Sequence, residues 1–542
     1  MNHADHLTRL SLQDKAARLI MIDLPGTGLS EADREHLGRH AWNGVILFAK
    51  NVASRAQVTD LIEAIHAASP QPALIAVDQE GGLVDRFRFP EMSLSPGAMA
   101  LGATQDPQAT YRAHVLMGRE LRDLGVHIDF APCLDVNVNP ANPIIGVRSF
   151  GEDSQSVADH ACAAIRGLRD GGVAPTAKHF PGHGDTSLDS HLALPTLTHD
   201  RERLEKVELL PFRAAIAEKV EAIMTAHVTF PALDPTEGLP ATLSEPVLTG
   251  LLRREMGYRG VIVTDSLAMR ALADHWGFAE ATVRSIQAGA DLVLALGPFS
   301  QQLEAVQGLV EAVQQGRLSE ARLDESLRRL ADLRQRFQAR PSAQPTWDVA
   351  SHQAEMRGIA SRAITVLLNR DNLLPLNLEP SEELLVLAPD LLPLSPLGEV
   401  SVRAPLAPLL SRFHSRVTEK AFHLSVAGPP VREVARFASE ASAVVLALYA
   451  RGRLPDAQRE LAQAVLEANP RTVLVSLSSP YILGDLPEAG ACVLGYNYGD
   501  FTLEAISEVL MGRRGASGRL PVTIPELFPA GHGLDLEVSP LG

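Results

Sequence analysis

The chain is poor in cysteine, lacks a long apolar run and has no excess of basic residues. Its 542 residues include three cysteines without a CxxC pair, a usage typical of reducing compartments. No stretch reaches the roughly 20 apolar residues of a membrane span. The formal charge of −16 leaves no basic stripe for phosphates or anionic lipid. We therefore expect neither a nucleic-acid nor a membrane partner.

The first six residues lack the basic-then-apolar layout of a signal peptide, which predicts a cytoplasmic protein. A hydrophobic content of 46% with 21% charged residues is that of a globular protein. A chain of this length exceeds one ordinary hydrophobic core and predicts at least two domains.

Eight short apolar runs alternate with helical stretches over the first 300 residues. They are 19–23, 44–48, 73–77, 127–131, 175–179, 222–227, 260–265 and 291–296. Residues 55–67, 109–124 and 203–218 have helical periodicity between them. This alternation predicts a parallel (β/α)₈ TIM-like barrel within residues 1–340.

Several of the predicted strands finish on a polar residue: Asp78, Lys178 with His179, His227 and Asp265. In a (β/α)₈ barrel the carboxyl ends of the strands carry the active site. These side chains should therefore meet at one mouth of the barrel.

A proline-rich break at residues 341–345 indicates a linker, which we place at 341–354. Residues 355–542 then predict a smaller α/β sandwich domain with a mostly parallel sheet. Its expected strands are 384–388, 443–448, 472–477 and 491–495. Its expected helices are 355–367, 431–441, 456–468 and 503–511.

Residues 178–191 hold three histidines, a lysine and two aspartates in fourteen positions. The segment follows a short apolar strand and contains two glycines, as expected of a loop that carries chemistry. Pro181 and Gly182 interrupt any helix, so the histidines lack the i, i+4 spacing of a helical zinc motif. We expect no metal and no cofactor.

Three segments in order resemble signatures of glycoside hydrolase family 3, in particular its β-N-acetylglucosaminidases. They are 178–191, the loop 77–82 with Arg86, and the strand 261–267 continuing to Met269. Residues 361–376 and 518–522 resemble the second domain of many family members. The resemblance implies an enzyme that hydrolyses terminal β-linked GlcNAc, most plausibly on peptidoglycan fragments.

Asp265 is the predicted nucleophile, since it ends a rigid strand and retaining hydrolysis needs a carboxylate there. The alternative is a cap on a helix at 266–272. Asp189 and His191 are implied as an acid/base dyad, in which the carboxylate orients the imidazole. Solvated side chains are the alternative for this pair.

Asp78 is the expected acceptor for sugar hydroxyls, with Arg86, Arg148, Lys178 and His179 as donors. A surface pair between Arg148 and Asp153 is the alternative for that arginine.

Four other polar residues have less defined expectations. Glu80 is interpreted as structural, and the role of Asp135 is left open. His183 and His227 either support the site residues or are hydrogen-bonded core histidines. Leu83 departs from the arginine that the family commonly has at this position.

The leading hypothesis is a retaining exo-β-N-acetylglucosaminidase with a small carbohydrate as its partner, as a monomer or homodimer. A phosphorylase is an alternative, because replacing an acid/base carboxylate by histidine removes a charge that repels phosphate. A family 3 β-glucosidase and a non-catalytic sugar-binding barrel are the others. Activity with and without phosphate distinguishes the first two.

Overall fold

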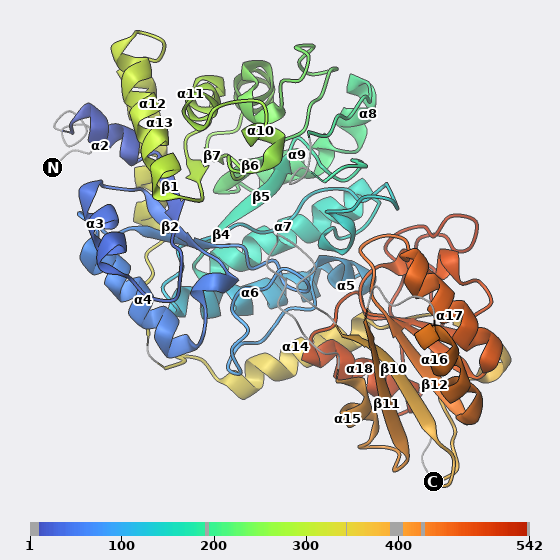
Figure 1. The fold of residues 1–542 in the computed structure, drawn as a ribbon. Coiled ribbons are helices and arrows are strands. Elements are labelled where there is room, and N and C mark those ends of the chain that lie inside the picture. Colours follow the sequence, from blue (N-terminus) through green and yellow to red (C-terminus); the bar gives the residue numbers. More distant parts are fainter. Residues whose placement is uncertain (1–9, 190–193, 343, 391–404, 424–428, 539–542) are drawn as a thin grey trace.

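The computed structural model describes residues 10–189, 194–342, 344–390, 405–423 and 429–538. They form a larger N-terminal domain, blue to yellow-green in Figure 1, and a smaller C-terminal domain beside it in orange and red. A yellow helix, α14 (Val349–Ala363), passes along the junction of the two.

The N-terminal domain is an eight-stranded parallel barrel. Its strands are β1 (Ile20–Asp23), β2 (Gly44–Leu47), β3 (Leu74–Val77), β4 (Ile128–Asp129), β5 (Ala174–Phe180), β6 (Ala222–Thr225), β7 (Val261–Val263) and β8 (Val293–Ala295). They pair in the order β7-β6-β5-β4-β3-β2-β1-β8, and one parallel bridge from Val263 to Leu292 links the two ends. Every strand residue is buried, as expected for parallel strands covered on both faces. The structure confirms the predicted barrel.

Helices cover the outside of the barrel. They are α2 (Leu12–Ala17), α3 (Glu31–Arg39), α4 (Arg55–Ala68), α5 (Ala98–Ala103), α6 (Pro107–Asp123), α7 (Ser154–Gly171), α8 (Arg201–Lys206), α9 (Leu209–Ala217), the π-helical segment Pro246–Glu255, α10 (Arg270–Ala273), α11 (Phe278–Ala288), α12 (Phe299–Gln314) and α13 (Glu320–Arg336). Helix α7 shows how the sequence determines where these helices begin and end. The Asp153 side chain accepts from the Ser156 amide at its start, and Gly172, at φ +96°, ends it.

The C-terminal domain is a six-stranded sheet with helices. Its elements are β9 (Thr365–Asn369), β10 (Leu384–Asp390), α15 (Leu406–Leu410), β11 (Val417–His423), α16 (Pro429–Glu440), β12 (Ala443–Leu448), α17 (Asp456–Ala468), β13 (Thr472–Ser476), β14 (Ala491–Leu494) and α18 (Asp500–Leu510). The strand order is β11-β10-β12-β13-β14-β9. Only β9 is antiparallel to its neighbour, so the predicted mostly parallel sheet is confirmed. None of the helices in the described ranges combines the length and apolar character needed to cross a membrane.

Helix α14 (Val349–Ala363) connects the two domains. It begins within the expected linker 341–354 and packs against α5 and α6 of the barrel and α18 of the second domain. The Asp348 side chain caps its first turn.

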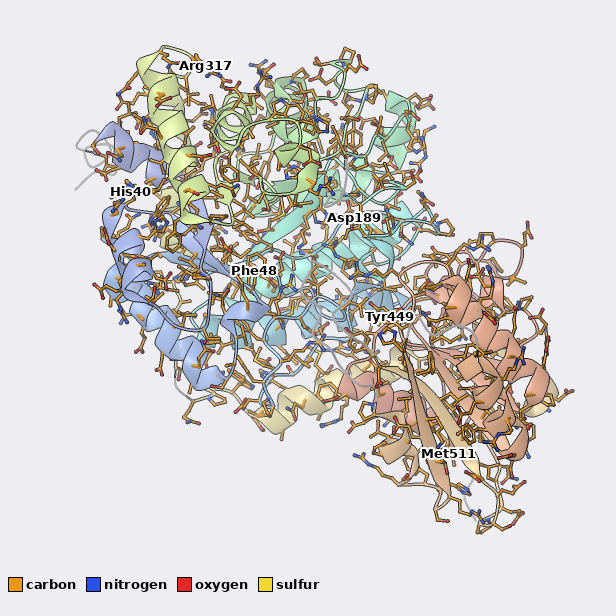
Figure 2. The ribbon with its side chains drawn as sticks, in the orientation of Figure 1. His40, Phe48, Asp189, Arg317, Tyr449 and Met511 are labelled. Carbon is orange, nitrogen blue, oxygen red and sulfur yellow. The ribbon has the colours of Figure 1, made fainter. Side chains whose placement is uncertain are left out.

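The second domain contacts the barrel loops that follow β3 and β4. Leu83, in the loop after β3, is 8% exposed and belongs to the hydrophobic core of the second domain. The Asn497 amide donates to the Pro96 carbonyl at 2.8 Å, and the Asn137 amide donates to the Tyr481 hydroxyl at 2.9 Å. In Figure 2, Tyr449 lies on the barrel-facing side of the second domain and Met511 lies far from it. Both loops are therefore held from outside the barrel.

Candidate active site

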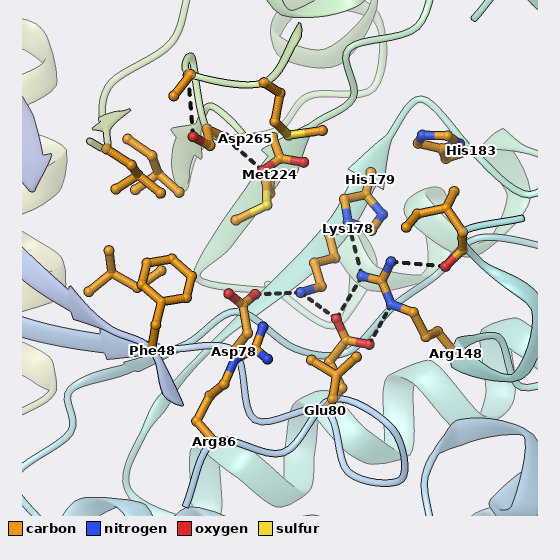
Figure 3. A pocket seen from close by; sticks show the side chains of 18 of the residues that line it. Phe48, Asp78, Glu80, Arg86, Arg148, Lys178, His179, His183, Met224 and Asp265 are labelled. Carbon is orange, nitrogen blue, oxygen red and sulfur yellow. Dashed lines mark hydrogen bonds and ion pairs between the residues drawn. The ribbon is translucent and has the colours of Figure 1, made fainter. Parts of the chain in front are cut away.

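A cavity of about 330 Å³ opens at the carboxyl ends of the barrel strands, where (β/α)₈ enzymes carry their chemistry. Figure 3 shows the side chains that face it. The polar residues that line it are Asp78, Glu80, Arg86, Arg148, Lys178, His179, His183, Asp265, Ser266 and Arg270. The apolar part of its wall includes Ile46, Phe48, Met224, Met269, Leu294 and Leu296.

Lys178, near the end of β5, is the centre of a buried ion-pair network (Figure 3). Its Nζ lies 2.7 Å from Asp78 Oδ1 and 2.6 Å from Glu80 Oε1. Arg148 binds the two oxygens of Glu80 at 2.7 and 2.9 Å. Burial alone would lower the pKa of Lys178, but Asp78 and Glu80 outweigh it and raise that pKa. Burial likewise raises the pKa of Glu80, but Arg148 and Lys178 hold it well below its usual range. Lys178 and Glu80 are therefore both charged at neutral pH.

Asp78 and Arg86 present polar groups to the cavity from the loop after β3. The Asp78 side chain is 18% exposed, and a carboxylate has more acceptor positions than Lys178 occupies. The Arg86 guanidinium lies 5.8 Å from the centre of the Phe48 ring. Both can reach a polyhydroxylated ligand.

His179 is oriented by a buried carboxylate beneath it. Its Nδ1 lies 2.6 Å from Asp135 Oδ2, and Asp135 Oδ1 accepts from the His183 amide at 2.7 Å. Burial raises the pKa of Asp135, yet the facing histidines outweigh it and leave that pKa at about 2. An ionised Asp135 fixes the proton of His179 on Nδ1. His179 Nε2, 3.4 Å from Arg148 Nη2, is then an acceptor.

Asp265 follows β7 on the other side of the barrel mouth. Its Oδ1 accepts from the Ser266 amide at 2.7 Å, and His227 Nε2 contacts the Ser266 carbonyl at 2.9 Å. The predicted helix at 266–272 is wrong, since α10 begins at Arg270 and its cap is Met269. Asp265 is therefore not a helix cap.

The loop after β5 is tied at its start by Asn142. The Asn142 amide donates to the carbonyls of His183 and Gly184 at 2.9 and 3.0 Å, and its oxygen accepts from the amides of Ile144 and Ile145. Gly184 fits because any Cβ there would lie 1.9 Å from the Val136 carbonyl oxygen. One amide thus joins the loop that precedes Arg148 to the loop that leads toward Asp189.

Six of the eight residues predicted for the site line the cavity: Asp78, Arg86, Arg148, Lys178, His179 and Asp265. Asp189 is half-buried and does not line it, and His191 lies outside the described residues. Arg148 pairs with Glu80 rather than with Asp153.

The structure adds contacts that sequence reasoning missed. Glu80 is a cavity residue that binds two cations, and Asp135 anchors two histidines. His183 lines the cavity, bonds to the Thr186 hydroxyl and has a pKa that burial lowers to about 4. Phe48 had one available signal, its position at the end of the predicted strand 44–48, whereas Met224 lies inside the predicted strand 222–227 and had none.

Two groupings of possible metal ligands occur among the described residues: Cys133, Asp135, His179 and Asp185, His199, Glu208. In the first, burial raises the pKa of the Cys133 thiol well above its usual value, whereas a thiolate is the metal-binding form. In the second, Arg203 binds both oxygens of Glu208 at 2.8 Å. Hydrogen bonds and ion pairs within the protein account for both groupings.

Comparison with known proteins assigns both domains of the chain to one family. Residues 11–333 match the glycosyl hydrolase family 3 N terminal domain, and residues 364–534 match the family's C-terminal domain. Beta-hexosaminidase A of Pseudoalteromonas piscicida is 37% identical over 373 residues, which are 63% of this chain and 62% of that protein. Beta-hexosaminidase of Xanthomonas oryzae pv. oryzae is 40% identical over 297 residues, which are 54% of this chain and 87% of that protein.

A solved structure is similar over nearly the whole chain. The glycoside hydrolase family 3 beta-N-acetylglucosaminidase from Paenibacillus sp. str. FPU-7 is 36% identical, with a TM-score of 0.89. The similarity covers 95% of this chain and 99% of that one, so it includes both domains and their relative placement.

Proposed function

The chain belongs to glycosyl hydrolase family 3 and is a glycoside hydrolase of the β-hexosaminidase type, and we propose that it is a retaining exo-β-N-acetylglucosaminidase. The observation that carries the proposal is the opposition, across one cavity, of Asp265 on β7 and the Asp78–Lys178–Glu80–Arg148 network on β3 to β5.

The ion-pair network suits recognition of a terminal sugar. Asp78 accepts hydrogen bonds from sugar hydroxyls, while Lys178, Arg148 and Arg86 donate to them. Because these groups are already charged and fixed by one another, little reorganisation is needed when the sugar enters. Phe48 and Met224 provide apolar wall for the ring and its substituents.

Asp265 attacks the anomeric carbon as the nucleophile and forms a covalent glycosyl–aspartate. The bond to the leaving-group oxygen breaks as the ester bond forms, and water later releases the sugar with retained configuration. The apolar side chains that line the cavity with Asp265 limit its solvation, which strengthens its interaction with the positive charge developing on the ring.

The His191 imidazole donates the proton that the leaving group needs, and Asp189 orients that ring. This dyad takes the place of the second carboxylic acid that most retaining glycosidases use. The same imidazole then removes a proton from the attacking water. We propose peptidoglycan fragments with terminal β-linked GlcNAc as the substrate.

The test compares leaving groups and substrates. His191→Ala should slow phenyl GlcNAc glycosides far more than dinitrophenyl ones, because an acidic leaving group needs no proton. Equal losses on the two glycosides would remove His191 from the mechanism. GlcNAc-anhydroMurNAc, chitobiose and cellobiose, each with and without phosphate, give the specificity. Preferential cleavage of cellobiose would favour a glucosidase, and phosphate-dependent turnover a phosphorylase.

A further inference from the structure

A second cavity, of about 360 Å³, lies between the two domains. The loop after β3 lines both cavities with alternate residues. Asp78, Glu80 and Arg86 face the first, whereas Asp85 and Arg88 line the second, together with residues of α14 and of the N-terminal end of α18. Ligand pockets occur preferentially at such domain junctions.

Two polar groups of this interdomain cavity have unmet hydrogen-bonding capacity. Asp85 is 4% exposed, and among the described residues it makes one hydrogen bond, from Gln79 Nε2 at 2.8 Å. Arg88 Nε is buried without a partner, while its Nη2 donates to the Gly82 carbonyl at 3.2 Å. Buried polar groups left in this state cost stability. Both side chains line the cavity.

The side chains that line the interdomain cavity indicate which class of ligand it can bind. Asp85 needs a donor and Arg88 an acceptor, and a hydroxyl group is both. A simple anion would face Asp85 and Glu504, and a simple cation would face Arg88 and Arg357, so the mixed lining disfavours each. The Phe89 and Phe501 rings also line the cavity and provide apolar faces for the C–H groups of a sugar ring.

We propose that the interdomain cavity is a second saccharide site, which binds the monosaccharide that the active site releases. The choice of GlcNAc rests on the proposed function; the saccharide class rests on the lining. The volume of about 360 Å³ suits one monosaccharide, because the active-site cavity, which takes one GlcNAc unit under that function, measures about 330 Å³.

Gln79 connects the second site to the first. It is 2% exposed, donates to Asp85, and accepts from the amides of Arg86 and Phe87 at 2.8 and 3.2 Å. A ligand that binds Asp85 therefore acts on the loop that carries Asp78, Glu80 and Arg86. Product bound there changes the KM of the active site.

Equilibrium dialysis of labelled GlcNAc against the full-length protein tests the proposal. We expect two molecules per chain in the wild type and one in Asp78→Asn, whose remaining site is the interdomain cavity. Adding Arg88→Ala or Phe501→Ala to Asp78→Asn should weaken that remaining binding about tenfold, the effect of one charge-assisted hydrogen bond or one ring contact.

Arg112→Ala is the matched control for these variants. Arg112 is a partly exposed arginine that pairs with Glu355 of α14 at 2.8 Å, and it does not line the cavity. It should leave both sites intact. Thermal unfolding of each variant verifies the fold, and Phe501→Ala serves if Arg88→Ala does not fold.

Two results would overturn the second site. One is a single GlcNAc per wild-type chain that Asp78→Asn abolishes. The other is displacement of GlcNAc from the Asp78→Asn protein by equimolar glycerol, which would mark the cavity as unselective for sugars. Failure of GlcNAc glycosides as substrates would refute the proposed function instead, because binding to the Asp78→Asn protein is measured without turnover.

Discussion

On the β3 to β5 side of the cavity, the charged groups are buried and bound to one another, and the second domain holds their loops from outside. On the β7 side, Asp265 shares the wall with Met224, Met269 and Leu294, and its Oδ1 accepts from the Ser266 amide. The first arrangement fixes charges in place before a sugar arrives. The second places a half-buried carboxylate among apolar side chains, where the proposed function puts the nucleophile. Under that proposal, sugar binding and bond breaking take place on opposite sides of one barrel mouth.

Asp265→Asn changes the β7 side of the cavity and leaves the β3 to β5 side as it is. We expect turnover to fall on the order of 10⁴-fold or more, because the amide cannot form the covalent intermediate. The dissociation constant for GlcNAc and the melting temperature should stay near the wild-type values. Steady-state kinetics measure the turnover, equilibrium dialysis of labelled GlcNAc measures the dissociation constant, and thermal unfolding measures the melting temperature. Residual activity of more than a few per cent would show that another group is the nucleophile.

Glu80→Gln changes the ion-pair network on the β3 to β5 side. It leaves Lys178 and Arg148 with less negative charge in a buried site, which should cost about 3 kcal/mol of stability and roughly 100-fold in kcat/KM. Denaturant unfolding and kinetics on an aryl GlcNAc glycoside provide the two readouts. The control is Glu35→Gln, whose partner Arg39 is on an exposed helix face and whose loss should cost less than about 1 kcal/mol. A stable, active Glu80→Gln enzyme would contradict the importance of the network.

Asn142→Asp tests a link within the β3 to β5 side, between the loop that precedes Arg148 and the loop after β5. The carboxylate cannot donate to the carbonyls of His183 and Gly184. The His183 carbonyl still accepts from the Thr186 hydroxyl at 3.0 Å, but the Gly184 carbonyl loses the Asn142 donor, at about 1–3 kcal/mol. If the loop after β5 brings the proton donor, phenyl glycosides should slow more than dinitrophenyl glycosides. Asn139→Asp is the control, because the Asn139 amide makes only long contacts of 3.5 and 3.4 Å to the same loop.

Asp85→Asn has the smallest expected effect. It changes the side of the loop after β3 that lines the interdomain cavity. Burial raises the pKa of Asp85 from 3.8 to about 7, so the folded state binds more protons than the unfolded state between these values. The contribution of Asp85 to the free energy of unfolding is therefore fully present below pH 4 and is lost as the pH rises to about 7. Asparagine does not titrate and still accepts from Gln79. The melting temperature of the Asp85→Asn variant should equal the wild-type value at pH 4 and exceed it by about 1 °C at pH 8.

The barrel could be predicted from the sequence because each strand is a short apolar run that is buried on both faces, and the runs alternate with helical periodicity. In the second domain, β9 and β11 were missed for different reasons. Residues 365–367 continue the apolar pattern of α14 and were assigned to the helix. Strand β11, Val417–His423, lies at the edge of the sheet and contains exposed polar residues, so its pattern is weak.

From local sequence alone, the site could be predicted where a reactive side chain ends a strand, whereas Arg86 and Arg148 were predicted from the family resemblance. Asp78, Lys178, His179 and Asp265 satisfy that rule. Glu80 and Asp135 could not be assigned, because their partners are distant in sequence: Glu80 binds residues 68 and 98 positions away, and Asp135 binds His179. Asn142 gave no signal for the same reason. Such pairings depend on the geometry of the closed barrel.

Leu83 makes the barrel depend on the second domain. It lies on the loop that carries Asp78 and Glu80, and it fills part of the second domain's core. Loss of that domain would leave a leucine at the barrel rim and free the loop that holds the charge network. A chain cut back to the barrel would therefore need a compensating substitution at Leu83.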